Sequence, residues 1–218
     1  MHIAVLGGTF NPIHFGHLRV AEEAREALGL DKVLFMPAFF PPHKEDPALV
    51  DADTRLEMVR LAVEGNPGFA VSDMELKRGG RSFTIDTVRE LKAGGKDGPR
   101  VSLIIGNDSF NDITTWCEYE ELLNLASFII VPRPGYPVKK PAEALPVELA
   151  RKFWYDSTSG AYGVSYRNSE GNSLTYLDCT LLDISSSDIR RRIREGRSVR
   201  YLLPDGVIGF IREKGLYR

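Results

Sequence analysis

Short apolar runs alternate with stretches of helical periodicity along much of the chain. The first pair is an apolar run at 3–6, followed at 18–28 by apolar residues that recur on one helical face. The same pattern predicts further strands at 32–37, 69–73, 101–105 and 127–131, and helices at about 54–63, 82–91 and 118–126. Strands and helices that alternate at this spacing predict a parallel sheet with crossover helices, and therefore an α/β fold.

The second half of the chain is less regular. Residues 139–176 carry no clear pattern, and 157–173 are rich in Ser, Gly and Asn, which is typical of a surface loop or hairpin. Apolar residues at 180–184 predict one more strand, and serines at the start of 185–194 predict a capped helix. A last helix is expected to begin at Pro204.

A turn rich in glycine and histidine, GGTFNPIHFGH at residues 7–17, joins the first predicted strand to the first predicted helix. In this arrangement backbone N–H groups and the positive end of the helix point at an anion, and the glycines let a ligand approach the backbone closely. The turn matches neither the P-loop nor the dinucleotide fingerprint, and His14 and His17 have no third metal ligand beside them. The turn is a predicted phosphate site; the alternative is an ordinary glycine turn with two satisfied histidines.

The stretch ISSSDIR at residues 184–190 is the second candidate anion site. Serine hydroxyls and the free N–H groups of a helix start bind phosphate oxygens, and Arg190, one turn into the helix, adds a fixed positive charge. The alternative is a capped, basic surface helix. The neighbouring Arg191, Arg192 and Arg194 are expected to form its solvated face.

A proline-rich loop after the second predicted strand carries Pro41-Pro42-His43-Lys44. Since the loop follows the carboxyl end of a strand, where ligands bind in doubly wound sheets, Lys44 is a candidate phosphate contact. The alternative is a plain surface loop. Of the four histidines, only His2 is expected to be purely structural.

Composition restricts the class of protein. The 218 residues are 43% hydrophobic and 27% charged, with a formal net charge of −2, so no overall basic field recruits nucleic acid. No apolar run is long enough to span a membrane, and the N-terminus lacks a signal pattern. Cys117 and Cys179 stand far apart and indicate reduced thiols. We expect a cytoplasmic protein with one domain over residues 1–218. This domain is expected to be a doubly wound parallel sheet with flanking helices, and its C-terminal part, about 185–218, is expected to be helical.

Both motifs resemble signatures of the nucleotidyltransferase superfamily related to class I aminoacyl-tRNA synthetases. Residues 7–17 match Gly-x-Phe-(Asp/Asn)-Pro-x-His-x-Gly-His, and residues 184–190 match Ile-Ser-x-(Ser/Thr)-x-Ile-Arg. Further stretches are similar to bacterial nicotinate-nucleotide adenylyltransferases: Phe83 to Thr87, Gly106 to Ser109, Trp116, Arg133 to Gly135, Tyr201 to Pro204 and Gly215 to Tyr217. The resemblance covers nearly the whole chain except about 139–176.

The resemblance implies a Rossmann-like fold and transfer of the adenylyl group of ATP to nicotinate mononucleotide, giving deamido-NAD and pyrophosphate, with Mg²⁺ bound to ATP and no metal ligand from the protein. The residues that it assigns to catalysis are His14, His17, Lys44 and Arg190. Those that it assigns to ATP are Gly7, Gly8, Thr9, Phe10, Gly106, Asp108, Ile184, Ser185 and Ser187. Those that it assigns to nicotinate mononucleotide are Phe83, Thr84, Asp108, Trp116, Cys117 and Arg133.

Two positions depart from the family pattern. Cys117 stands where an aromatic residue often follows the tryptophan, and Phe83 stands in place of Tyr. Because the acceptor phosphate is already an anion, the reaction needs no general base, and the protein supplies positioning and charge stabilisation. Nicotinamide mononucleotide, phosphopantetheine or a phospho-alcohol remain alternative acceptors, and a non-catalytic nucleotide-binding regulator is the alternative from another class. Neither a nucleic acid nor a membrane is an expected partner, and the sequence leaves the oligomeric state open.

Overall fold

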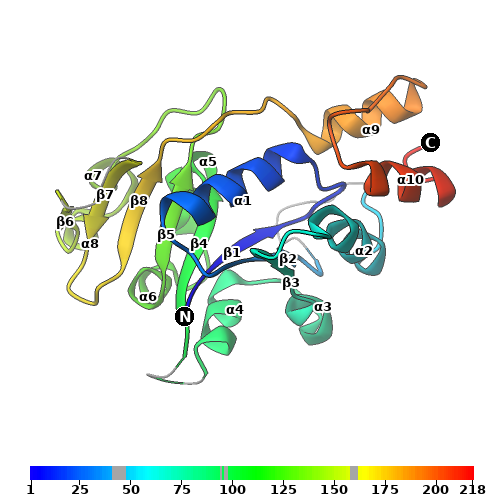
Figure 1. Ribbon diagram of the computed structural model, residues 1–218. Helices are drawn as coiled ribbons and strands as arrows, with labels where there is room; N and C mark the ends of the chain where they lie inside the picture. The colour runs from blue at the N-terminus through cyan, green and yellow to red at the C-terminus, as the bar shows by residue number, and fades with distance from the viewer. Residues whose placement is uncertain (41–47, 94, 96–97, 158–161) are drawn as a thin grey trace.

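The computed structural model describes residues 1–40, 48–93, 95, 98–157 and 162–218, and it is built on an eight-stranded sheet. The strand order is β3-β2-β1-β4-β5-β8-β7-β6, and the strands from β3 to β8 pair in parallel (Figure 1). β7 and β6 pair antiparallel at one end of the sheet. The strands are β1 (His2–Gly8), β2 (Lys32–Pro37), β3 (Phe69–Val71), β4 (Arg100–Gly106), β5 (Ser127–Val131), β6 (Trp154–Tyr155), β7 (Gly163–Arg167) and β8 (Ser173–Leu177).

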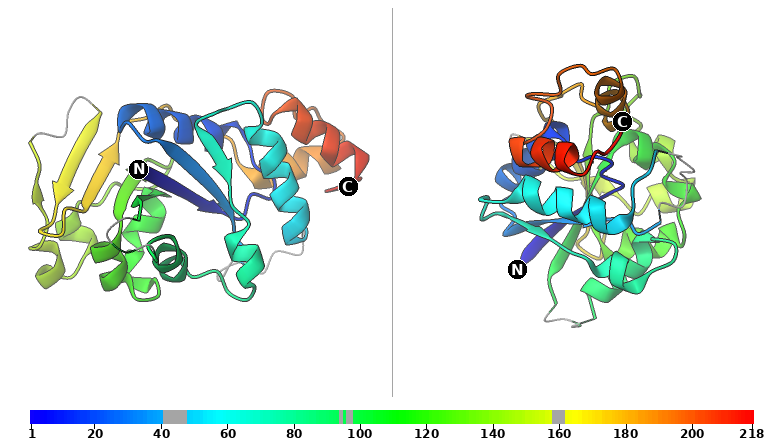
Figure 2. Two further views of the ribbon diagram at one scale, coloured as in Figure 1. Left: turned by 60° about the horizontal axis from the view of Figure 1, so that its bottom comes forward. Right: turned by 90° about the vertical axis from the view of Figure 1, so that its right-hand side faces the viewer.

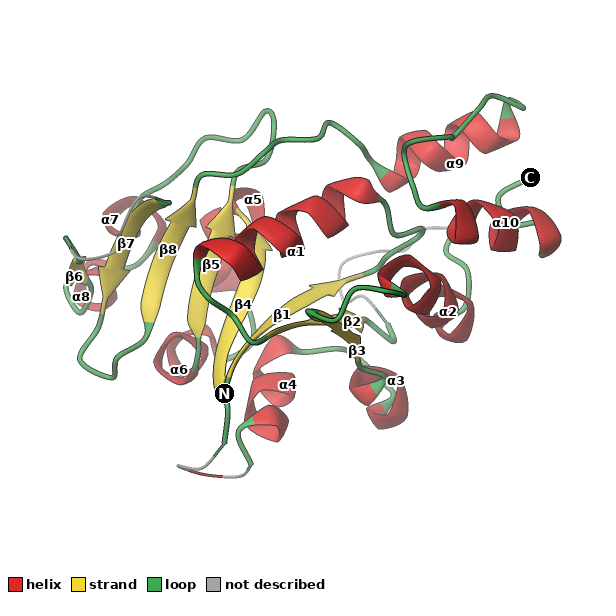
Figure 3. Cartoon of the chain, viewed as in Figure 1, coloured by secondary structure: helices red, strands yellow, loops and turns green. Residues whose placement is uncertain are grey.

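Helices cover both faces of this sheet, as the red and yellow elements of Figure 3 show. β1 explains why: Ala4 and Leu6 enter one apolar cluster, while Ile3 and Val5 enter the other. The first cluster includes residues of α1 (Phe15–Ala27), α2 (Ala52–Val63), α9 (Ser186–Arg194) and α10 (Asp205–Glu213). The second includes residues of α4 (Thr84–Leu91), α5 (Asn107–Asn111), η2 (Ile113–Thr115), α6 (Tyr119–Leu125), α7 (Pro141–Ala144) and α8 (Val147–Ala150), and a further short helix is α3 (Met74–Arg78).

The predicted doubly wound α/β fold is thus confirmed, with a mostly parallel sheet. Successive strands run outward from β1 to β3 in one direction and from β4 to β8 in the other, so the topological switch lies between β1 and β4. Ligands bind at the carboxyl ends of the strands beside such a switch. α9 and α10 lie at one end of the molecule and the β6–β7 hairpin at the opposite end (Figure 2).

The strand predicted at 180–184 is wrong. The last parallel strand is β8 instead, and residues 178–185 form no strand. Leu181 and Leu182 are 49% and 40% exposed, whereas Leu174 and Leu177 of β8 are buried. A short apolar run does not reveal by itself whether it is buried, and here the Ser- and Asn-rich flanks concealed the real strand.

Smaller differences concern turns. The predicted loop or hairpin at 157–173 is a hairpin in its described part, formed by β7 and the start of β8. Gly106 is followed directly by the short helix α5. Gly29 follows the C-terminus of α1 with φ +57°, the left-handed conformation that glycine commonly adopts at this position. Among the described residues, no helix combines the length and apolarity needed to cross a bilayer.

Replacing Gly163 with alanine is expected to destabilise the fold by about 2 kcal/mol or more. Gly163 has φ +144°, and a Cβ there would lie 1.9 Å from the backbone oxygen of Tyr176 on the paired strand β8. Urea unfolding measures the loss. Gly171→Ala is the matched control, because its φ of +81° is also strained but its Cβ would meet open space. Equal losses for both variants would contradict the predicted clash.

Candidate active site

The two predicted anion sites line one cleft at the carboxyl ends of β1 and β4. The cleft has a volume of about 630 Å³. One wall is the turn after β1, and the other is the start of α9 with the residue before it. Its described lining residues are Leu6, Gly7, Gly8, Thr9, Phe10, Asn11, His14, His17, Leu49, Ile104, Ile105, Gly106, Ser109, Trp116, Arg133, Ile184, Ser185, Ser186, Ser187 and Arg190.

Phe10 is the buried aromatic residue of the turn and packs against His17. Its ring is 2% exposed, its backbone has φ +49°, and its ring packs edge-on against the His17 ring with centroids 5.1 Å apart. A Cβ on Gly8 would lie 3.1 Å from atoms of the Phe10 ring. The absence of a side chain at Gly8 therefore leaves room for the Phe10 ring, and it also lets a ligand in the cleft approach the backbone closely. Phe10 is mainly a support for His17, although atoms of this residue reach the cleft.

His17 lines the cleft, and its ring is fixed by contacts with its neighbours. Its Nδ1 accepts a hydrogen bond from the backbone N–H of His14 at 3.3 Å, which places the proton of a neutral ring on Nε2. The His14 and His17 rings stack with centroids 3.8 Å apart. Because the start of α1 fixes both rings, a donor on His17 needs no reorientation to meet an anion.

His14 is neutral in the unliganded protein. Its side chain is buried, and its Nδ1 has no hydrogen-bond partner among the described residues. Burial, with a smaller contribution from the charge of Arg133, lowers the pKa of His14 to about 4. A Cβ on Gly16 would lie 3.0 Å from His14 Nδ1, so the glycine between the two histidines leaves that ring its space. At pH 7 His14 offers a hydrogen-bond donor and carries no charge.

The low pKa of His14 predicts a pH dependence of stability. In the unfolded chain the ring takes up a proton near pH 6.5 and in the folded chain only near pH 4, so stability falls as the pH falls through this window. Between pH 6.5 and pH 4.5 the loss due to His14 is about 2 kcal/mol. Urea unfolding of the wild type and His14→Gln at both values tests this. Equal pH dependence of the two proteins would contradict the expected proton uptake, since all other groups are shared.

The start of α9 is bonded directly to the histidine turn. Ser185 is the N-cap and accepts from the Asp188 N–H at 3.1 Å, while Ser186 Oγ donates to the Pro12 carbonyl at 2.8 Å. Arg190 is 9% exposed, and its Nη1 donates to the Asn11 carbonyl at 2.8 Å. Two segments far apart in sequence are therefore locked side by side, and their N–H groups, hydroxyls and guanidinium face one volume.

Asp108 and Arg133 lie at the β4 end of the cleft. Arg133 Nε lies 3.6 Å from Asp108 Oδ1, and the Arg133 N–H donates to Asn107 Oδ1 at 2.7 Å. Arg133 lines the cleft, whereas Asp108 contacts Arg133 but is not among the described lining residues. A Cβ on Gly106 would lie 2.2 Å from Asp108 Oδ1, so any other residue at this position would displace the Asp108 carboxylate from Arg133.

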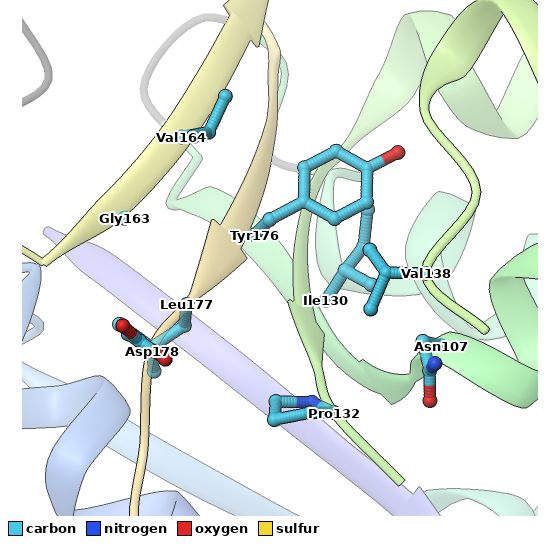
Figure 4. Close-up of a pocket in the computed structure, with 9 residues that line it drawn as sticks. All are labelled: Asn107, Ile130, Pro132, Val138, Gly163, Val164, Tyr176, Leu177 and Asp178. Carbon is cyan, nitrogen blue, oxygen red and sulfur yellow. The ribbon is translucent and has the colours of Figure 1, made fainter. Parts of the chain in front are cut away.

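A second cavity, of about 230 Å³, lies between residues of β5, β7 and β8 and the loop after β5 that contains Arg133 (Figure 4). Its apolar side chains Ile130, Val138 and Val164 lie around the Tyr176 ring. Asn107 Nδ2 donates to the carbonyls of Tyr136 and Pro137, and the Tyr176 hydroxyl donates to the Lys139 carbonyl at 2.8 Å. These hydrogen bonds fix the loop after β5.

A pocket of about 380 Å³ adjoins the cleft and shares Ser109 and Trp116 with it. Its described lining residues are Ser82, Phe83, Thr84, Ser109, Thr115, Trp116 and Cys117, and none of these seven is charged. α4 begins at Thr84, so the first N–H groups of a helix face this region. Glu118 follows Cys117 with φ +49°, and its carboxylate accepts from Arg89 Nη2 at 2.6 Å.

Most of the predicted site residues thus come together around these two spaces. The cleft is lined by Gly7, Gly8, Thr9, Phe10, His14, His17, Gly106, Trp116, Arg133, Ile184, Ser185, Ser187 and Arg190, and the adjoining pocket by Phe83, Thr84, Trp116 and Cys117. Asp108 contacts Arg133 from behind, and Lys44 lies outside the described residues. The described lining also includes Ser82, Ser109, Thr115 and Ser186, which the sequence did not assign to the site; Ser186 and Ser109 stood inside the stretches 184–190 and 106–109 that carry the resemblance, whereas Ser82 and Thr115 had no such signal.

Comparison with known families agrees with this arrangement. The cytidylyltransferase-like family model matches residues 5–192, a range that contains both walls of the cleft. Fold and cleft together define a nucleotidyltransferase of the cytidylyltransferase-like family.

Two relatives define the family more narrowly. One in Citrifermentans bemidjiense, named a probable nicotinate-nucleotide adenylyltransferase, is 53% identical over 217 residues, which cover 100% of this chain and 98% of the relative. One of the same name in Geobacter sp. strain M21 is 51% identical with the same coverage. The chain belongs to the nicotinate-nucleotide adenylyltransferase family, which confirms the predicted resemblance.

The fold also matches a distant solved structure. Plasmodium falciparum nicotinic acid mononucleotide adenylyltransferase, complexed with NaAD, superposes with a TM-score of 0.72 at 17% identity and covers 99% of this chain and 97% of its own. At this identity the likeness concerns the fold alone.

Proposed function

We propose that the protein transfers the adenylyl group of ATP to nicotinate mononucleotide, releasing pyrophosphate and forming deamido-NAD. The observation that carries this proposal is the single cleft lined by both anion-binding motifs, next to an uncharged pocket of aromatic and hydroxyl side chains. The names of the two full-length relatives support the same reaction. A cytoplasmic location, where ATP is available, is part of the proposal.

ATP occupies the cleft with its triphosphate between the histidine turn and α9. Backbone N–H groups at Gly8 and Thr9 and at the start of α9 donate to phosphate oxygens. Arg190 and Arg133, which both line the cleft, add positive charge. Lys44 is proposed as a further phosphate contact, on sequence grounds alone.

Nicotinate mononucleotide occupies the adjoining pocket, with its ring near Trp116 and its phosphate directed into the cleft. The pyridine carboxylate meets the N-terminal end of α4 at Thr84, where free N–H groups and the helix dipole favour an anion. Since none of the seven described lining residues is negatively charged, nothing among them repels the acid. This arrangement favours nicotinate over nicotinamide mononucleotide.

The reaction requires the acceptor phosphate to attack the α-phosphorus of ATP in line with the departing pyrophosphate. The acceptor oxygen forms the new P–O bond as the bond between the α-phosphorus and the bridging oxygen breaks, and the electron pair of the broken bond leaves on that oxygen with pyrophosphate. No proton needs to be removed from the nucleophile. The role of His17 is to donate from Nε2 to the α-phosphate as negative charge increases there, with neutral His14 stacked against it.

Mg²⁺ is expected to enter with ATP. Within the part of the chain that the structure describes, no group of three or more His, Cys, Asp or Glu side chains forms a metal cage. The described cleft donors are N–H groups, hydroxyls and guanidinium groups, which fit phosphate oxygens and leave the nucleotide itself to hold the ion. When bound, Mg²⁺ neutralises charge on the leaving pyrophosphate.

The direct test is to incubate the purified protein with ATP, Mg²⁺ and one acceptor at a time, and to measure pyrophosphate and the dinucleotide product. We expect turnover with nicotinate mononucleotide and at least tenfold lower kcat/KM with nicotinamide mononucleotide. Release with phosphopantetheine or a phospho-alcohol in place of these would assign another acceptor. ATP binding without turnover on any acceptor would favour a nucleotide-binding regulator.

A further inference from the structure

Arg55 is the largest fully buried side chain among the described residues, and the proposed reaction does not use it directly. It lies on α2, is 1% exposed, and does not line the cleft or the adjoining pocket. Its guanidinium keeps its positive charge at pH 7. No carboxylate of the described residues lies within ion-pair distance of it. Burying a charge costs free energy, and without an ion-pair partner that cost is offset mainly by the hydrogen bonds that the guanidinium makes.

The guanidinium joins three loops through their backbone carbonyls. Nη1 donates to Thr9 at 2.8 Å, Nη2 to Phe39 at 3.0 Å, and Nε to Val50 at 3.1 Å. Thr9 lines the cleft and belongs to the turn after β1. The Phe39 N–H in turn donates to Ser82 Oγ at 3.0 Å, and Ser82 lines the adjoining pocket. Thr9 in the wall of the cleft is therefore connected to Ser82 in the wall of the pocket by three hydrogen bonds, through Arg55 and Phe39.

A second buried bond fixes the same turn two residues further on. The Tyr217 hydroxyl donates to Asn11 Oδ1 at 2.7 Å, and Asn11 Nδ2 donates to the Ala48 carbonyl at 2.9 Å. The Asn11 carbonyl is the acceptor for Arg190. Tyr217 is 9% exposed and, like Arg55, is absent from the described lining of the cleft. The turn is thus held at Thr9 and at Asn11 by two side chains, Arg55 and Tyr217, that are not among the described lining residues of the cleft.

We infer that Arg55 and Tyr217 are positioning residues, which fix the phosphate-binding turn relative to the acceptor pocket and so align the two reacting phosphates. This inference rests on the proposed function, since it concerns the geometry of that reaction. In-line attack depends on the relative position of the two substrates, and a displacement of about 1 Å can cost about 10²-fold in rate. Substrate affinity depends on contacts that neither residue makes. Their loss should therefore lower kcat while KM stays nearly constant.

The first test is Arg55→Lys, which keeps the charge but cannot reach three carbonyls in a planar fork. We expect kcat to fall about 10- to 10²-fold, with KM for ATP and for nicotinate mononucleotide within about threefold of the wild type. Arg60→Lys is the matched control, on the same helix but 53% exposed, and should be unchanged. Rates are expressed per nucleotide-binding site counted by calorimetric titration with ATP, so that unfolded protein does not count as slow enzyme.

The second test is Tyr217→Phe, which removes a single hydroxyl and leaves the ring. We expect kcat to fall about three- to tenfold, as for the loss of one hydrogen bond, again with little change in KM. Tyr201→Phe, at an 84% exposed position, is its control. This variant decides the question if Arg55→Lys does not fold.

Variants with wild-type kcat per binding site, or with a loss that appears only in KM or in the number of binding sites, would overturn the inference. A wild-type protein that binds ATP but transfers nothing would refute the proposed function instead. The two failures are therefore distinguishable.

Discussion

Replacing His17 with alanine is expected to lower kcat by about 10²–10³-fold, the usual cost of removing one oriented donor to a developing negative charge. His17 Nδ1 is already occupied by the His14 N–H, and the ring rests on Phe10 and on His14. With Nδ1 as an acceptor, the neutral ring carries its proton on Nε2, which is the atom proposed to donate to a phosphate. A steady-state assay with ATP and nicotinate mononucleotide measures the loss. Turnover near the wild-type value in a folded variant would contradict the proposed role.

Two substitutions separate the helix-capping role of His17 from its chemical role. In His17→Asn the side-chain oxygen can still accept from the His14 N–H, yet nothing reaches the position of Nε2, so kcat should stay as low as in the alanine variant. In His17→Gln the longer side chain brings an N–H group toward that position, and part of the rate should return. The reverse order would indicate that capping of α1, and not donation to phosphate, explains the loss.

Replacing Arg190 with methionine is expected to lower kcat/KM for ATP by at least about 10²-fold. The side chain is 9% exposed, and it both bonds the Asn11 carbonyl and lines the cleft, so its loss removes a fixed charge from the phosphate site and an anchor of the turn. Hydrogen bonds from a charged donor are about twice as strong as neutral ones. Kinetics at varied ATP concentration measure the change.

Arg194→Met is the matched control for Arg190→Met. Arg194 lies on the same helix, is exposed, and does not line the cleft. We expect unchanged kinetics, because the charge of the solvated face is screened by salt. Equal losses in both variants would mean that the overall basic charge of α9 matters, and not the buried guanidinium.

The parts of the fold that could be predicted from the sequence are those in which the local pattern of apolar residues is compatible with only one kind of secondary structure. Continuous apolar runs such as 101–105 and 127–131 are buried on both faces of the sheet, which is why β4 and β5 were found where expected. The run at 180–184 has similar composition but crosses the surface toward α9. Burial depends on tertiary packing, which a run of five residues does not encode.

The sequence also predicted most of the residues that line the cleft, although their roles are untested. The backbone of the cleft requires particular residue types, such as glycine against the Phe10 ring and beside His14, and such requirements can be recognised in a single sequence. Arg55 was not found in this way, because an arginine within an amphipathic helix normally lies on the solvated face. Only the packed structure places it against three carbonyls. The contribution of Lys44 and the substrate roles of the lining residues stay predictions.

The bonds that join the histidine turn to α9 span nearly the whole chain: Ser186 to Pro12 is a separation of 174 residues, and Arg190 to Asn11 is one of 179. Closing loops of this length is slow and comes late in folding, since most chain entropy must be lost before such contacts form. A triphosphate bound between the two segments, as proposed above, would hold them together and shift the equilibrium toward the docked state by mass action. In a cell rich in ATP, the substrate would then act as a folding aid for the very site that consumes it.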